Sequence, residues 1–189
     1  MKRKFYEWLI YFSFSVLTLI IGCTKSKPIK AAVVSAREEA SSIGIAVMEK
    51  GGSAFDAMIA TDLALTVCFP NAGNISGGGF MVYRTASGET GSLDYREKAP
   101  MGASANMYLD AEGNVIPGKS TLGGLAIGVP GTVAGLAEIH KKFGSLPWKD
   151  LVQPAIDLAE NGYVVTEKQE SSFKNKKVDH KTLEELEST

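Results

Sequence analysis

Residues 70–100 read PNAGNISGGGFMVYRTASGETGSLDYREKAP, and the rest of the fold is organised around this stretch. The runs Phe80–Arg84 and Ser92–Tyr95 are β-prone and are separated by turn-forming residues, so the pattern predicts a β-hairpin. Three glycines, Gly77 to Gly79, precede the first strand and allow another part of the chain to approach the backbone closely. Arg96 follows the second strand, and at the rim of a sheet its guanidinium can hold a carboxylate through two parallel hydrogen bonds.

One strand and one helix are predicted at the start of the domain. The apolar run Ala31–Val34 predicts a short strand. Ser35 and Glu38 have the spacing of a capping box, which predicts a helix that continues through Lys50. The pair Gly51-Gly52 is typical of a helix end.

The most apolar helix is predicted between that glycine pair and the hairpin. Ser53 and Asp56 have the spacing of a second capping box, and the helix Ala54–Val67 is apolar nearly all round. A helix of this kind is buried on most of its surface. Pro70 prevents the helix from continuing. Cys68 is expected to be a buried, small apolar residue with a free thiol.

Three helical segments are predicted in the last third of the chain. Pro130 opens a helix that ends at Phe143. Pro147 opens another, which is interrupted near Pro154 and ends before a glycine. Residues 166–189 are strongly charged and predict an exposed helix.

The N-terminal segment has the pattern of a secretory signal. Residues 2–4 are basic, and Leu9–Ile21 is an apolar run too short to span a bilayer comfortably. The run ends in Ile20-Ile21-Gly22-Cys23, which resembles the lipobox of bacterial lipoproteins. The alternative interpretation is a signal anchor with an incidental cysteine.

These patterns divide the chain into three parts. We expect residues 1–22 to be a cleaved signal peptide, residues 23–30 to be a tether lipidated on Cys23, and residues 31–189 to form the domain. The predicted location is therefore the bacterial cell envelope, with a lipid anchor in the membrane and the domain facing the periplasm.

The composition is that of one globular domain without an obvious ion or nucleic-acid partner. The chain has 189 residues, 44% hydrophobic and 22% charged, with a net charge of −1. This balance gives no electrostatic footprint for nucleic acid. His140 and His180 are far apart, and Cys68 is the only cysteine of the predicted mature domain, so we expect neither a metal site nor a Ser–His triad.

Two glycine patterns imitate nucleotide-binding motifs. The segment Gly113–Ser120 fits the pattern of a phosphate-binding P-loop, which requires a strand before it and a helix starting at its Lys-Ser end. The sequence after Ser120 is Thr-Leu-Gly-Gly, a poor helix start, so nucleotide binding is not expected. The triple glycine follows a helix and precedes a strand, which is the reverse of a dinucleotide-binding loop.

Taken together, five blocks of this chain resemble the γ-glutamyltranspeptidase (glutathione hydrolase) family. They occur in the family's order and extend over roughly residues 31–170. The blocks are Gly51–Ala57, Asn71–Met81, Asp94–Pro100, Gly128–Gly135 and Val152–Ala155.

The resemblance implies an α+β fold, the αββα sandwich of N-terminal-nucleophile hydrolases. It also implies a precursor that cleaves itself, after which the new N-terminal threonine of a small subunit attacks γ-glutamyl compounds such as glutathione. No metal or organic cofactor is implied. Arg96 matches the arginine that holds the α-carboxylate of the glutamyl group, whereas Asn74 and the glycines Gly77 to Gly79 match a block that builds a wall of the site.

The match is confined to the first part of the family's large subunit, and no Thr-Thr-His processing motif is found. We therefore expect an incomplete sandwich with half of the substrate pocket, which needs the remainder of the large subunit and the small subunit as partners. One alternative is a relative that acts on acyl side chains or on poly-γ-glutamate. Others are a binding lipoprotein that retains the Arg96 pocket without catalysis, and an inert truncated product.

Overall fold

The computed structural model describes residues 31–175. Every helix and strand among the described residues belongs to one compact unit, which begins at Val33. Cys23, His180 and the predicted signal peptide lie outside the described residues. The helices are α2 (Glu38–Glu49), α3 (Ala54–Cys68), α4 (Thr132–Phe143), α5 (Trp148–Asn161) and α6 (Glu167–Asn175), with strands β1 (Phe80–Arg84) and β2 (Thr90–Asp94) and a short 3₁₀ turn, η1 (Gly124–Ala126).

The start of the domain differs from the prediction. Residues 31–34 belong to no strand, because the part of the chain that the structure describes places no second strand beside them. The N-cap residue of helix α2 is Arg37, whose side chain makes no capping hydrogen bond. The predicted cap, Ser35, instead donates its hydroxyl to the Arg37 carbonyl at 2.8 Å, so the capping box predicted from Ser35 and Glu38 is wrong. The helix ends at Glu49, one residue before the predicted Lys50, and the amide of the following Gly51 donates to the Met48 carbonyl.

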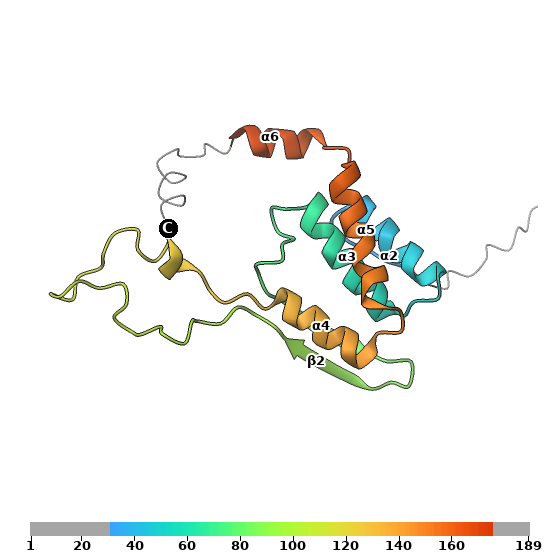
Figure 1. Cartoon of the computed structure of the whole chain (residues 1–189), viewed down its shortest axis with the longest axis horizontal. Helices are drawn as coiled ribbons and strands as arrows, with labels where there is room; N and C mark the ends of the chain where they lie inside the picture. The colour runs from blue at the N-terminus through green and yellow to red at the C-terminus, as the bar shows by residue number, and fades with distance from the viewer. Residues whose placement is uncertain (1–30, 176–189) are drawn as a thin grey trace, which may run out of the picture. The chain divides into compact units, whose positions relative to one another are not determined.

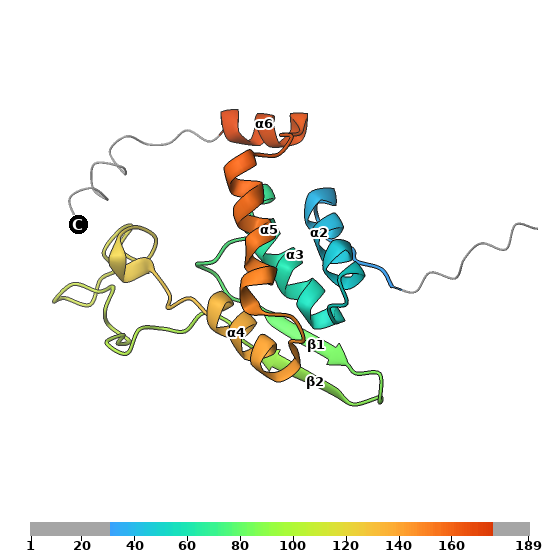
Figure 2. The same cartoon turned by 45° about the vertical axis from the view of Figure 1, so that its right-hand side comes forward.

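Helix α3 forms the centre of the core, as its sequence predicts. Both hydrogen bonds of the Ser53–Asp56 capping box are present. The helix packs against α2, α4 and α5 (Figures 1 and 2). Ile59 and Ala60 are fully buried, and Cys68 is a buried free thiol at the end of the helix. Burial of each large aliphatic side chain is worth about 1.5–3 kcal/mol, which explains why this helix is apolar nearly all round.

Asp56 links α3 to the loop between α4 and α5. Its side chain is fully buried and accepts hydrogen bonds from the amides of Ser53, at 2.7 Å, and Ser145, at 3.1 Å. The hydroxyl groups of the same two serines also donate to it. Burial pushes the pKa of Asp56 upward, but the hydrogen bonds from Ser145 and Ser53 outweigh burial and hold the pKa below its ordinary value.

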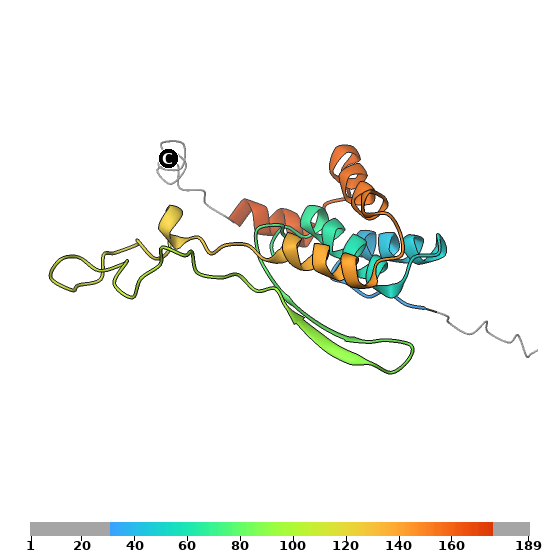
Figure 3. The same ribbon diagram turned by 60° about the horizontal axis from the view of Figure 1, so that its bottom comes forward.

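The hairpin lies on one side of the helices (Figure 3). Its strands are antiparallel, with Phe80 opposite Asp94 and Arg84 opposite Thr90. Met81 is buried against the helices, whereas Phe80 and Val82 point outward and are 62% and 84% exposed. The second strand ends at Asp94, one residue earlier than predicted, although the Tyr95 amide still donates to the Gly79 carbonyl at 3.0 Å.

The C-terminal helices follow the predicted pattern with two corrections. Pro130 precedes the cap of α4, Gly131, and is therefore outside the helix. Helix α5 runs through Pro154 without the predicted interruption. Its burial explains the continuity, because Leu151 and Ala155 on either side of the proline are packed in the core. No helix within residues 31–175 is long and apolar enough to cross a membrane.

Candidate functional site

The triple glycine caps helix α4 with its backbone. The first residue before α4, Gly131, has no side chain with which to satisfy the amides of the first turn. The carbonyl of Gly77 accepts hydrogen bonds from the amides of Gly131 and Thr132, at 2.8 and 3.0 Å. Two glycine-containing blocks more than 50 residues apart in sequence are thereby joined beside the end of β2.

The segment Tyr95-Arg96 lies between these two blocks. A Cβ atom on Gly78 would lie 2.7 Å from the Tyr95 carbonyl oxygen and 2.8 Å from the Arg96 Cα. A Cβ on Gly131 would overlap the same carbonyl from the other side, and one on Gly135 would overlap the Tyr95 ring. Only glycine therefore permits this approach, and the backbone that carries Arg96 is fixed from both sides.

Hydrogen bonds on either side of Arg96 complete this arrangement. The Arg96 amide donates to Asp94 Oδ1 at 3.0 Å. Two residues further on, Lys98 and Val129 exchange backbone hydrogen bonds of 3.1 and 2.8 Å. Burial, and to a smaller extent the charge of Asp62, raise the pKa of Tyr95.

The Arg96 side chain itself is open to solvent. It is 67% exposed, and its Nε lies 3.5 Å from Glu97 Oε2. Its Cζ lies 6.0 Å from the centroid of the Phe80 ring. Among the described residues, no hydrogen bond to either terminal nitrogen of the guanidinium is found. A fixed backbone with two unoccupied guanidinium nitrogens is suited to bind a carboxylate.

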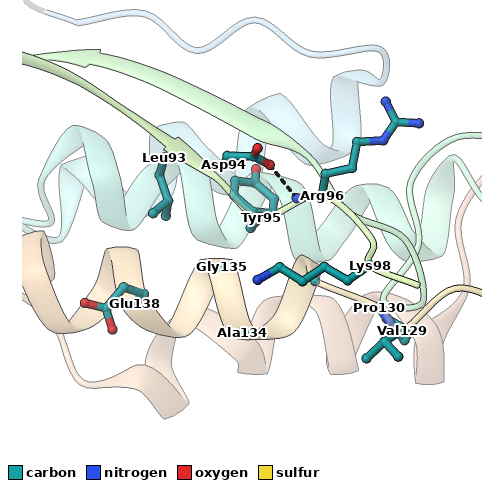
Figure 4. A pocket seen from close by; sticks show the side chains of 11 residues that line it. Leu93, Asp94, Tyr95, Arg96, Lys98, Val129, Pro130, Ala134, Gly135 and Glu138 are labelled. Atoms are coloured by element: carbon teal, nitrogen blue, oxygen red, sulfur yellow. Dashed lines mark hydrogen bonds between the residues drawn. The ribbon is translucent and has the colours of Figure 1, made fainter. Parts of the chain in front are cut away.

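A pocket of about 310 Å³ lies beside this segment, between the end of β2 and α4. Figure 4 shows the Arg96 guanidinium pointing away from Lys98 and Glu138, so the backbone of Arg96 lines the pocket but its charged group does not enter it. Sequence reasoning did not predict that Lys98 and Glu138 line one pocket, because they belong to segments 40 residues apart. The lining residues are Leu93, Asp94, Tyr95, Arg96, Lys98, Val129, Pro130, Gly131, Ala134, Gly135 and Glu138.

The other candidate residues have structural surroundings. Around Gly113–Ser120, a turn closes at Asp110 and the next element is only the short 3₁₀ turn Gly124–Ala126, so the helix that a P-loop needs is missing. His140 Nε2 lies 2.8 Å from the Leu146 carbonyl oxygen, and its ring packs edge-on against Trp148. Within residues 31–175, no group of three or more potential metal ligands is found.

Comparison with known proteins decides the family. The sequence pattern described as Gamma-glutamyltranspeptidase matches residues 40–188. The chain belongs to the gamma-glutamyltranspeptidase family. The "Glutathione hydrolase proenzyme" of a Pseudomonas species is 52% identical over 133 residues, which are 70% of this chain and 23% of that protein. The protein of the same name from Escherichia coli is 43% identical over 135 residues, 71% of this chain and 23% of the relative.

Solved structures of similar proteins have the same fold. The Helicobacter pylori gamma-glutamyltranspeptidase is 48% identical with a TM-score of 0.74, over 79% of this chain and 43% of that one. The Bacillus anthracis transpeptidase enzyme CapD is 34% identical with a TM-score of 0.58, over 74% of this chain and 41% of that one.

These matches confirm the predicted family and its α+β, N-terminal-nucleophile hydrolase fold. The chain spans about a quarter of the length of the curated relatives it matches. The domain boundaries, the lipidation of Cys23 and the role of Arg96 remain predictions.

Proposed function

We propose that residues 31–175 form part of the substrate site of a γ-glutamyltransferase or glutathione hydrolase, in which Arg96 binds the α-carboxylate of the γ-glutamyl group. The observation that carries this proposal is that Arg96 has a fixed backbone and an open guanidinium. Its backbone is fixed between Gly78 and Gly131, while two guanidinium nitrogens have no partner among the described residues. The relatives named glutathione hydrolase proenzyme support the substrate class.

The proposed reaction needs groups beyond Arg96. The nucleophile is the N-terminal threonine of a small subunit, whose hydroxyl attacks the γ-glutamyl carbonyl and expels the amine of the substrate. Water or an amino acid then takes the glutamyl group from the resulting ester. Arg96 holds the far end of the substrate during both steps, which fixes the position of the reacting carbonyl. Since no Thr-Thr-His motif occurs in these 189 residues, we propose that they do not catalyse the reaction alone.

A chimaera with the Helicobacter pylori enzyme, which is 48% identical, tests this function. Residues 31–175 replace the corresponding part of that enzyme, and release of p-nitroaniline from γ-glutamyl-p-nitroanilide is measured after self-cleavage. We expect turnover by the chimaera and none by the 189-residue chain. A second chimaera exchanges residues 77–98 only. It retains more of the host enzyme's packing and therefore serves if the larger exchange does not fold.

Two results would contradict the proposal. Turnover by the purified 189-residue chain would show that it holds its own nucleophile. A folded, self-cleaved chimaera that is inactive would show that these residues do not form a working part of the site. Glutamate binding without turnover in that chimaera would favour the binding lipoprotein.

We also propose that the protein is exported and anchored to the cell envelope through lipid on Cys23. The support is the basic segment, the apolar run and the lipobox-like Ile-Ile-Gly-Cys sequence. Each buried methylene of an acyl chain contributes about 0.8 kcal/mol of membrane affinity. Cys23→Ser is expected to prevent lipidation and signal cleavage, because the lipid is attached to the cysteine in this proposal. Mass spectrometry of the membrane fraction that finds Met1 intact in the parent would contradict this.

A further inference from the structure

Phe80 lies next to the proposed carboxylate-binding residue. It is the first residue of β1, on the outward face of the hairpin, opposite Asp94. Asp94 in turn accepts a hydrogen bond from the Arg96 amide, so the backbone of Arg96 is held beside the start of β1. The Arg96 Cζ lies 6.0 Å from the Phe80 ring centroid, a distance at which a guanidinium is attracted to the negative face of an aromatic ring.

Two sides of the guanidinium are thus already occupied. Its Nε lies 3.5 Å from Glu97 Oε2, and its Cζ lies over the Phe80 ring. The remaining edge carries Nη1 and Nη2, which make no hydrogen bond within the part of the chain that the structure describes. This edge has the geometry to make two parallel hydrogen bonds with a carboxylate.

We propose that Phe80 is a positioning residue for Arg96: its ring holds the guanidinium so that Nη1 and Nη2 face the incoming carboxylate. The inference rests on the proposed function, because it takes Arg96 as the carboxylate-binding residue. The Arg96 side chain is 67% exposed and loses rotamer freedom when it binds a carboxylate. The Phe80 ring reduces that loss, because it restricts the side chain before the substrate arrives.

Fluorination of Phe80 separates this role from packing. Phenylalanine with one, two or three ring fluorines keeps nearly the same shape but progressively loses the negative ring face. In the self-cleaved chimaera we expect the KM for γ-glutamyl-p-nitroanilide to rise stepwise, by about 2- to 5-fold with three fluorines, the range of an exposed cation–π contact. The kcat is expected to stay unchanged, because the carboxylate is held equally in the ground and transition states.

Two controls accompany the series. Trifluorophenylalanine at Phe173, an exposed aromatic on α6, is expected to leave the KM unchanged. In an Arg96→Ala background, fluorination of Phe80 is expected to have no further effect, since its action passes through the arginine.

The outcomes distinguish this inference from the proposed function. If Arg96→Ala raises the KM but fluorination of Phe80 does not, Arg96 binds the carboxylate without the help of the ring, and the inference is wrong. An equal rise in both Arg96 backgrounds would also overturn it, because Phe80 would then act by another route. If Arg96→Ala itself leaves the KM unchanged, the proposed role of Arg96 is wrong, and the inference about Phe80 that rests on it is wrong as well.

Discussion

Replacement of Asp56 by alanine is expected to lower the melting temperature of the protein by about 6–12 °C, which corresponds to roughly 3 kcal/mol at 2–4 °C per kcal/mol. The reason is that the carboxylate is fully buried and accepts hydrogen bonds from both Ser53 and Ser145. Hydrogen bonds to charged groups are worth about 1.5–3 kcal/mol each, and the substitution removes the acceptor shared by the amides and hydroxyl groups of Ser53 and Ser145. Thermal denaturation of parent and variant, monitored by circular dichroism, measures the shift.

Asp150→Ala is a matched control, since Asp150 also lies in the first turn of a helix but is exposed. We expect it to change the melting temperature by less than a third of the Asp56→Ala shift, as exposed substitutions usually stay within about 0.5 kcal/mol. Equal shifts for the two variants would show that the hydrogen bonds of Asp56 add little stability.

The contribution of Asp56 should depend on pH in one direction. Its pKa is lower in the folded protein than in the unfolded chain, so the folded state favours the charged form. The stabilisation is therefore complete above the unfolded value, about 3.9, and is lost as the pH falls through the folded value. The difference in melting temperature between parent and Asp56→Ala is expected to be constant above about pH 5 and to narrow below about pH 4. A difference that widens on acidification would contradict the assigned direction.

Arg96→Ala in the active chimaera is expected to lower kcat/KM for γ-glutamyl-p-nitroanilide by roughly 10- to 150-fold, because hydrogen bonds to a charged group are worth about 1.5–3 kcal/mol. Most of the loss should appear in KM, since the carboxylate is held equally before and during the reaction. Arg96→Lys should recover only part of the activity, because an ammonium retains the charge but not the two parallel donors. Steady-state kinetics of the self-cleaved proteins measure both effects.

Arg84→Ala is the matched control, because Arg84 is also exposed and lies at the opposite end of the hairpin. It is expected to leave the kinetics unchanged. A substrate without the α-carboxylate should be poor for the parent and nearly indifferent to Arg96→Ala. Activity of a folded, self-cleaved Arg96→Ala enzyme within twofold of the parent would assign Arg96 to the scaffold instead.

Elements with local causes follow directly from the amino-acid sequence. The Ser53–Asp56 capping box and the apolar residues after it predict α3, and the structure has both. The two β-prone runs around a turn predict the hairpin, with the first strand correct to the residue. The five motif blocks likewise identify the family from the sequence, because each block requires particular residues at adjacent positions.

Features that depend on distant partners arise only in the folded chain. Residues 31–34 have strand-like composition, but a strand also needs a neighbour with which to form hydrogen bonds. Pro154 breaks a helix in isolation, yet α5 continues because its buried face is held in the core. The support of Arg96 has the same origin: the Gly77 carbonyl meets the start of α4 only after the chain has folded. Local sequence specifies the glycines, but packing between segments more than 50 residues apart decides which backbone they allow to approach.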